Sequence, residues 1–207
     1  MPFLTNIGSQ KVESHEIKRK DGLPYFTVEP SGLGVLHTTE GGNVSGALTA
    51  FEKNFDPPHF LVGENRIIQC RPLGARAAAL RSNHYDSPND NAQIQIEMVG
   101  FSQKKLWLPD DPTLNGALLI MAYCYKHFGI PLQPPNNAWP DDLSDMPQPW
   151  ASDNKRRQVA ANGMWPSAKG WWMHLEVPYQ DPTWHWDCGA LQRKEMFNRA
   201  AALVPSV

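Results

Sequence analysis

The stretch AQIQIEMVGF, residues 92–101, limits the possible folds most strongly, because apolar and polar side chains alternate along it. Alternation with a period of two is typical of a β-strand that buries one face. Ile94, Ile96 and Met98 share that face, and Glu97 therefore points to the opposite side. The stretch predicts a sheet strand that packs its apolar face in a core and presents a carboxylate on its other face.

Further strands are predicted by two apolar segments. GLGVLH, residues 32–37, is bounded by glycine and followed by the polar TTEGG, so it predicts a buried strand that ends at His37. HFLVGENRIIQC alternates on both sides of Gly63-Glu64-Asn65, the pattern of a β-hairpin. A histidine is thus expected at the end of a buried strand.

Helices are predicted between and after these strands. Residues 43–55 carry apolar side chains at a spacing of four, and residues 189–203 form a last apolar stripe. In DDPTLNGALLIMAYCYKHFG we expect Asp111 as the N-cap, Pro112 in the first helical position and Gly129 as the stop. Strands and helices that interleave in this way favour an α/β fold, with one mixed β-sheet flanked by helices.

The chain is long enough for one large domain, since it has 207 residues of which 41% are hydrophobic. We expect residues 1–30, which are polar and mixed, to be an N-terminal arm or irregular lead-in that wraps on a domain of residues 31–207. Residues 131–150 hold six prolines without periodicity and predict a long loop, a class that often forms lids or binding walls.

Charge and composition exclude several classes of partner. The net charge is −2, from 19 basic and 21 acidic residues, which predicts neither nucleic-acid nor membrane binding. No apolar run reaches the roughly 18 residues of a membrane span, and no secretory signal pattern is found, so we expect synthesis in the cytoplasm. Three distant cysteines do not suggest a disulfide framework. We expect a monomer.

The segment WWMHLEVPYQDPTWHWDCGAL, residues 171–191, is expected to be irregular and concentrates side chains that bind metals. A catalytic zinc usually takes three ligands from His, Asp, Glu or Cys and leaves a fourth position for water. His37 together with members of this segment could supply them; the candidates are His174, His185, Asp187 and Cys188. A histidine at a strand end is also common as a packed core residue, which is how we interpret His59 in the hairpin.

The order of these pieces resembles the zinc-dependent N-acetylmuramoyl-L-alanine amidase family, which includes phage endolysins and peptidoglycan-recognition proteins. The resemblance covers residues 32–192. GVLHTTEGG matches the strand that precedes the first zinc histidine, and HFLVGENRIIQCRP matches the segment after it. IQIEMVG matches the strand with the catalytic glutamate, MHLEVP the second zinc histidine, and HWDCGAL the last ligand. The resemblance implies the fold of this family.

The resemblance also implies roles for five residues. His37, His174 and Asp187 match the zinc ligands, Glu97 the glutamate that moves the proton of the attacking water, and His185 the residue that contacts the reacting carbonyl oxygen. Some family members use cysteine as the third ligand, and Cys188 follows Asp187 directly. We favour Asp187, because the residue two before it is His185, whereas Trp186 stands two before Cys188.

The implied function is hydrolysis of the amide between N-acetylmuramic acid and L-alanine in peptidoglycan, with one Zn²⁺, by a bacteriolytic endolysin of a phage or prophage that acts on the wall after release. Alternatives are a non-catalytic peptidoglycan-binding module, a cytoplasmic muropeptide-recycling amidase, an antibacterial effector, or a metal amidase with another substrate. Arg71 and Arg81 are candidates to contact a carboxylate of the peptide stem, or else lie on the solvated surface.

Overall fold

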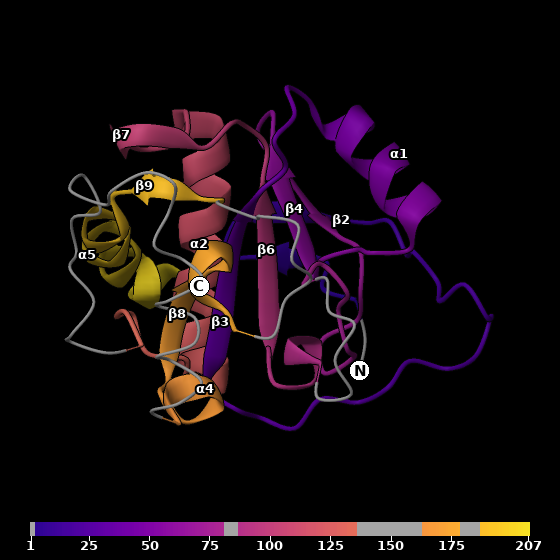
Figure 1. The fold of residues 1–207 in the computed structure, drawn as a ribbon. Helices are drawn as coiled ribbons and strands as arrows, with labels where there is room; N and C mark the ends of the chain where they lie inside the picture. Colours follow the sequence, from indigo (N-terminus) through magenta and orange to yellow (C-terminus); the bar gives the residue numbers. More distant parts are fainter. Residues whose placement is uncertain (1–2, 81–86, 136–162, 179–186) are drawn as a thin grey trace.

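We describe residues 3–80, 87–135, 163–178 and 187–207 of a computed structural model. Strands alternate with helices along the chain (Figure 1), as the sequence predicts. The elements are β1 (Asn6–Ile7), β2 (Gln10–Ser14), β3 (Leu33–Thr38), α1 (Val44–Asn54), β4 (Phe60–Gly63), β5 (Arg66–Gln69), η1 (Pro88–Asp90), β6 (Ile94–Met98), β7 (Gln103–Trp107), α2 (Asp111–Phe128), α4 (Met164–Ser167), β8 (Gly170–Met173), η2 (His174–Glu176), β9 (Gly189–Leu191), α5 (Arg193–Leu203) and η3 (Val204–Ser206).

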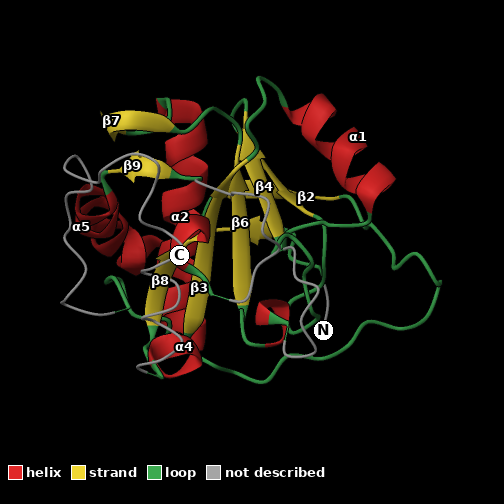
Figure 2. Ribbon diagram, in the orientation of Figure 1, coloured by secondary structure: helices red, strands yellow, loops and turns green. Residues whose placement is uncertain are grey.

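The main sheet has seven strands in the order β1-β2-β5-β4-β6-β3-β8. Strands β4, β6, β3 and β8 are parallel neighbours, whereas β5 pairs antiparallel with β4 and β1 antiparallel with β2. The sheet is therefore mixed, which confirms the predicted class. Strands β7 and β9 form a separate parallel pair beside α5 (Figure 2).

Both faces of the sheet are covered. Ile94, Ile96 and Met98 of β6 belong to the largest apolar cluster, which also contains the buried side chains of α2. On the opposite face, Leu61 of β4 packs with Phe51 of α1 in a smaller cluster. Helix α5 packs against α2 rather than on the sheet. Because the strand alternates, Glu97 points to the face that carries α1, as expected.

Local signals in the sequence set the turns and helix ends. The β4–β5 hairpin turns at Glu64 and Asn65, both in the left-handed region with φ of 54° and 60°, as a two-residue hairpin turn requires. Asn43 caps α1 through its side chain, which accepts from the N–H of Gly46. The N-cap of α2 is Asp110 and not Asp111 as predicted: the carboxylate of Asp110 accepts from the N–H of Thr113.

Three regions differ from the sequence-based expectation because pairing with distant strands decides their structure. The last helix begins at Arg193, since residues 189–191 pair with β7 as strand β9. The lead-in is not irregular throughout: β2, at residues 10–14, extends the main sheet beside β5. The first part of the metal-rich segment is the regular strand β8, which pairs with β3.

Only residues 131–135 of the predicted long loop 131–150 fall within the described part of the chain. The division of the chain at residue 30 stays a prediction. Among the described residues, no helix combines the length and the apolarity that crossing a bilayer demands.

Candidate metal centre

Three neighbouring parallel strands end at the same edge of the sheet and place polar side chains there. His37 lies near the carboxyl end of β3, Glu97 lies beside it in register on β6, and His174 follows directly after β8. The strands lie side by side in the order β6, β3, β8 (Figure 1). The carboxyl ends of parallel strands are the usual place for ligand sites in α/β sheets, so residues separated by 137 positions meet here.

His37, His174 and Asp187 form a compact buried group. Nδ1 of His37 lies 2.9 Å from Nδ1 of His174, which lies 2.9 Å from Oδ2 of Asp187. The third edge, from Nδ1 of His37 to Oδ2 of Asp187, is 3.7 Å. All three residues are at most 4% exposed. Among the described residues this is the only group of three or more His, Cys, Asp or Glu side chains close enough to hold a metal ion.

The donor set fits a zinc ion. Zinc binds imidazole nitrogen and carboxylate oxygen at about 2.0–2.2 Å in tetrahedral geometry, so two of its ligand atoms lie roughly 3.3 Å apart. Two of the three distances between the candidate ligand atoms are shorter than this value and one is longer. Two imidazoles and one carboxylate also leave the fourth position of a tetrahedron for water or substrate. The three residues could therefore hold one metal ion with an open coordination position.

Glu97 lies next to this group without joining it. Its Oε1 is 3.9 Å from Nδ1 of His37, and its Oε2 is buried with no hydrogen-bond partner among the described residues. Burial, and then the negative charges of Asp187, Asp56 and Glu40, raise the pKa of Glu97 well above its ordinary value. A carboxyl group with a raised pKa can accept a proton and release it again nearer neutral pH.

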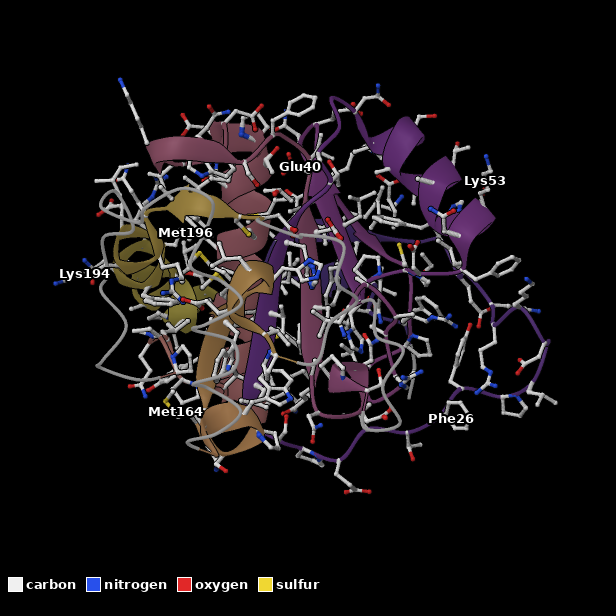
Figure 3. All side chains as sticks on the ribbon, in the orientation of Figure 1. Phe26, Glu40, Lys53, Met164, Lys194 and Met196 are labelled. Atoms are coloured by element: carbon white, nitrogen blue, oxygen red, sulfur yellow. The ribbon has the colours of Figure 1, made fainter. Side chains whose placement is uncertain are left out.

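A second carboxylate, Glu40, stands at the same edge of the sheet (Figure 3). Its φ of 47° puts a non-glycine residue in the left-handed region, a conformation with an energetic cost that the surroundings must maintain. Its Oε1 accepts from the hydroxyl groups of Thr38 and Ser102, at 2.8 and 2.6 Å, and from the N–H of Ser102 at 3.0 Å. These bonds hold the Glu40 side chain in place.

The group opens into a cavity of about 230 Å³ at this edge. Glu97, His174 and Asp187 line it together with residues that the sequence analysis did not select, which are Thr38, Thr39, Glu40, Ala50, Phe51, Asn54, Asp56 and Ala79. Glu40 comes three residues after His37, so an acidic residue just beyond a predicted strand end was the available signal. No sequence pattern pointed to Asp56, which reaches the cavity only through the path that the chain takes after α1.

Cys188, the alternative third ligand, takes a different position. It is fully buried in the large apolar cluster of the core, and its carbonyl oxygen accepts from Nε1 of Trp107 at 2.9 Å. His59 is also fully buried but away from the group: its Nδ1 accepts from the N–H of Gln95, and its Nε2 donates to the carbonyl oxygen of Ala75. Of these residues, Asp187 is the one placed beside the two histidines.

His185, which the motifs predict to contact the reacting carbonyl oxygen, falls outside the described residues, as does Arg81. Arg71 is only 2% exposed, so it does not lie on the solvated surface. Its guanidinium stacks on the ring of Tyr25 and lines a second cavity of about 420 Å³. Residues 55, 77 and 78 line this second cavity. They are neighbours in the chain of residues 54, 56 and 79, which line the first cavity.

The sequence matches no protein-family model and no curated protein. Solved structures are similar in fold. The hydrolase AmiA of Staphylococcus aureus, solved with its ligand, aligns with a TM-score of 0.55 at 13% identity over 93% of this chain and 84% of its own. AmpD, solved as a selenomethionine derivative, aligns with a TM-score of 0.54 at 14% identity over 96% of this chain and 99% of its own. The chain has the fold of these proteins.

The endolysin N-acetylmuramoyl-L-alanine amidase LysCS from Clostridium intestinale also aligns, at 11% identity over 91% of this chain and 94% of its own, with a TM-score of 0.48. The fold assignment depends on AmiA and AmpD, whose alignments include nearly the whole chain. The amidase-like fold predicted from the motifs is therefore confirmed.

Proposed function

We propose that the protein is a zinc-dependent N-acetylmuramoyl-L-alanine amidase that hydrolyses the amide between N-acetylmuramic acid and L-alanine in peptidoglycan. The observation that carries the proposal is the buried group of His37, His174 and Asp187 beside Glu97, at the cavity. The motif resemblance supports the same substrate. A pure binding module has no use for a buried metal-ligand set next to a carboxylate, which argues against that alternative.

The zinc ion and the side chains of the protein would carry out different parts of the reaction. Zinc held by His37, His174 and Asp187 would polarise the amide carbonyl and lower the pKa of a bound water. In this proposal Glu97 takes the proton of the attacking water and delivers it to the nitrogen that leaves, a role supported by its position 3.9 Å from Nδ1 of His37. The water oxygen bonds to the carbonyl carbon, the carbon–nitrogen bond breaks, and the products are a carboxylic acid and the amine of L-alanine.

The polar residues around the cavity would orient the substrate. In this proposal His185, inferred from the motif, donates a hydrogen bond to the carbonyl oxygen as its negative charge develops. Arg71, in the adjoining cavity, offers a buried positive charge, and its Nε and Nη1 have no hydrogen-bond partner among the described residues. We infer that this second cavity receives the carboxylate-bearing peptide part of the substrate.

The test is to digest purified peptidoglycan with zinc-loaded protein and to analyse the products by mass spectrometry. The proposal expects free peptides with an N-terminal L-alanine, and glycan chains with intact N-acetylmuramic acid. Products cut within the peptide or the glycan would reject it. No cleavage at all, together with retention of the protein on peptidoglycan, would favour the binding module.

The biological setting that we propose is a phage or prophage endolysin, and muropeptide recycling is the alternative. The two differ in substrate, because an endolysin meets cross-linked wall and a recycling enzyme meets small soluble fragments. Turnover of intact sacculi at a rate comparable with soluble muropeptides supports the endolysin. Activity confined to soluble muropeptides supports recycling.

A further inference from the structure

A buried ion pair lies next to the turn that carries His174. Glu176, in η2, and Arg193, the first residue of α5, are each 1% exposed. Nη1 of Arg193 donates to Oε2 of Glu176 at 2.8 Å, and Nη2 donates to Oε1 at 2.9 Å. This is a bidentate pair between two planar groups, a geometry that fixes direction as well as distance.

The pair also holds the backbone that precedes His174. Oε2 of Glu176 accepts from the N–H of Met173 at 2.9 Å, and Nη1 of Arg193 donates to the carbonyl oxygen of Trp171 at 3.3 Å. Helix α5 is thereby joined to the last strand residues before His174. On α5, Met196 is buried in the core cluster and Lys194 is exposed (Figure 3), so the helix is anchored on the side that carries the pair.

The same turn is bonded to the third ligand candidate. The N–H of Leu175 donates to the carbonyl oxygen of Asp187 at 2.8 Å. The turn therefore contacts Asp187 through the N–H of Leu175, while the Glu176 carboxylate holds the N–H of Met173, the residue before His174. A shift of this turn would move His174 and Asp187 relative to His37, which is set by the central strand β3.

Stability alone does not account for this pair. Two desolvated charges in a protein interior often contribute no more than well-packed apolar side chains of similar size. Arg193 also stands at the N-terminal end of α5, where the helix dipole disfavours a cation. What the pair provides, and apolar side chains do not, is a defined orientation of the turn.

We propose that Glu176 and Arg193 form a positioning pair that holds His174 and Asp187 at the spacing of metal ligands. The inference rests on the proposed zinc site and extends it by two residues that do not touch the ion. Outer partners that orient metal ligands typically change metal affinity by about 10- to 100-fold when they are removed.

The experiment compares zinc affinity and stability in the full chain. The double variant Glu176→Leu with Arg193→Met removes both charges and keeps apolar volume. We expect its zinc dissociation constant, measured by competition with a chelating indicator, to rise by about 10-fold or more. Its metal-free unfolding free energy should fall only by the cost of the lost hydrogen bonds to the Met173 N–H and the Trp171 carbonyl oxygen, because no charge is left unpaired.

Two further proteins make the outcome decisive. Arg193→Lys keeps the charge but cannot form the bidentate pair, so its zinc affinity should also fall, and it remains informative if the double variant does not fold. The matched control is Glu13→Gln with Arg66→Met, which removes the bidentate pair between β2 and β5, where both side chains are about 40% exposed. Zinc affinity should not change in this control.

The inference and the proposed function fail in different ways. Zinc affinity equal to that of the wild type in both Arg193→Lys and the apolar variant would overturn the positioning role and leave the zinc site intact. A wild-type protein that binds no zinc would overturn the proposed function and the inference together.

Discussion

The sheet contains two kinds of buried histidine, which differ in the groups that face their ring nitrogens. The ring of His59 is fixed by backbone groups, the N–H of Gln95 and the carbonyl oxygen of Ala75. His37 and His174 instead turn Nδ1 atoms toward one another and toward carboxylates. Backbone partners fix one neutral tautomer in the core, whereas converging nitrogens and acids make a group that can bind a cation.

Burial alone does not distinguish a structural histidine from a metal ligand. Both kinds are essentially inaccessible to solvent here. The position along the strand separates them: His59 stands just before β4, while His37 stands near the carboxyl end of β3 and His174 just after that of β8. Four predictions test this distinction.

The largest effect is expected for Asp187→Ala, which removes a proposed ligand. Zinc affinity should fall by more than the roughly 100-fold caused by losing an outer partner, and hydrolysis should be lost. The measurement is zinc competition with an indicator. The matched control is Cys188→Ala, which changes the neighbouring core residue and should keep wild-type affinity. Loss of zinc in Cys188→Ala with retention in Asp187→Ala would reverse the assignment.

Glu97→Gln should separate proton transfer from metal binding. The amide is nearly isosteric with the carboxylate but cannot accept the proton of water. We therefore expect kcat to fall by about 10²- to 10⁴-fold, while zinc content and unfolding free energy stay close to those of the wild type. Steady-state kinetics together with elemental analysis provide the check. A fully active Glu97→Gln enzyme would remove Glu97 from the mechanism.

His185→Ala should lower kcat by on the order of 100-fold and leave KM and bound zinc little changed, since a hydrogen bond to the developing oxyanion acts mainly in the transition state. Kinetics on a soluble muropeptide would measure both constants. A change limited to KM would make His185 a substrate-binding residue. Loss of zinc would make it a ligand.

The fourth prediction concerns the structural histidine, where the expected effect is on stability and not on catalysis. Burial lowers the pKa of His59 to about 4, and the nearby Arg71 acts in the same direction, against the Ala75 bond. The unfolded chain, with an ordinary histidine pKa near 6.5, therefore takes up the proton first. Stability from neutral His59 is present above pH 6.5 and is lost as the pH falls toward 4, by up to about 3 kcal/mol.

This prediction is checked by denaturant unfolding of metal-free protein between pH 7 and 4. His59→Gln keeps an acceptor and a donor but does not titrate. As the pH falls, the unfolding free energy of the wild type should therefore decrease relative to that of the variant. Parallel pH curves would show that His59 does not titrate on unfolding as described.

Much of the fold could be predicted, because the buried strands and capped helices carry their signals locally. The alternation around Glu97 and the hairpin at Glu64 and Asn65 depend only on neighbouring residues. Strands β2, β7 and β9 depend on partners far away in the chain, so their short segments gave no clear signal. The N-cap of α2 was missed by one residue because two aspartates stand in succession there.

The site residues that lie in family-like motifs could be predicted from the sequence, and the other site residues could not. His37, Glu97, His174 and Asp187 follow from the family-like order of the motifs, and the parallel strands β3, β6 and β8 explain why the first three meet. Their roles remain predictions. Glu40 was not selected although it follows a predicted strand end, and the pair of Glu176 and Arg193 depends on three-dimensional contacts that no spacing in the sequence reveals.

X-ray absorption spectroscopy of the zinc-loaded protein would show whether two histidines and Asp187 bind one zinc ion. We expect one zinc per chain, surrounded by nitrogen and oxygen at about 2.0–2.2 Å, with two imidazoles and no sulfur. A sulfur neighbour at about 2.3 Å would identify Cys188 as a ligand, and failure to bind stoichiometric zinc would contradict the metal centre itself.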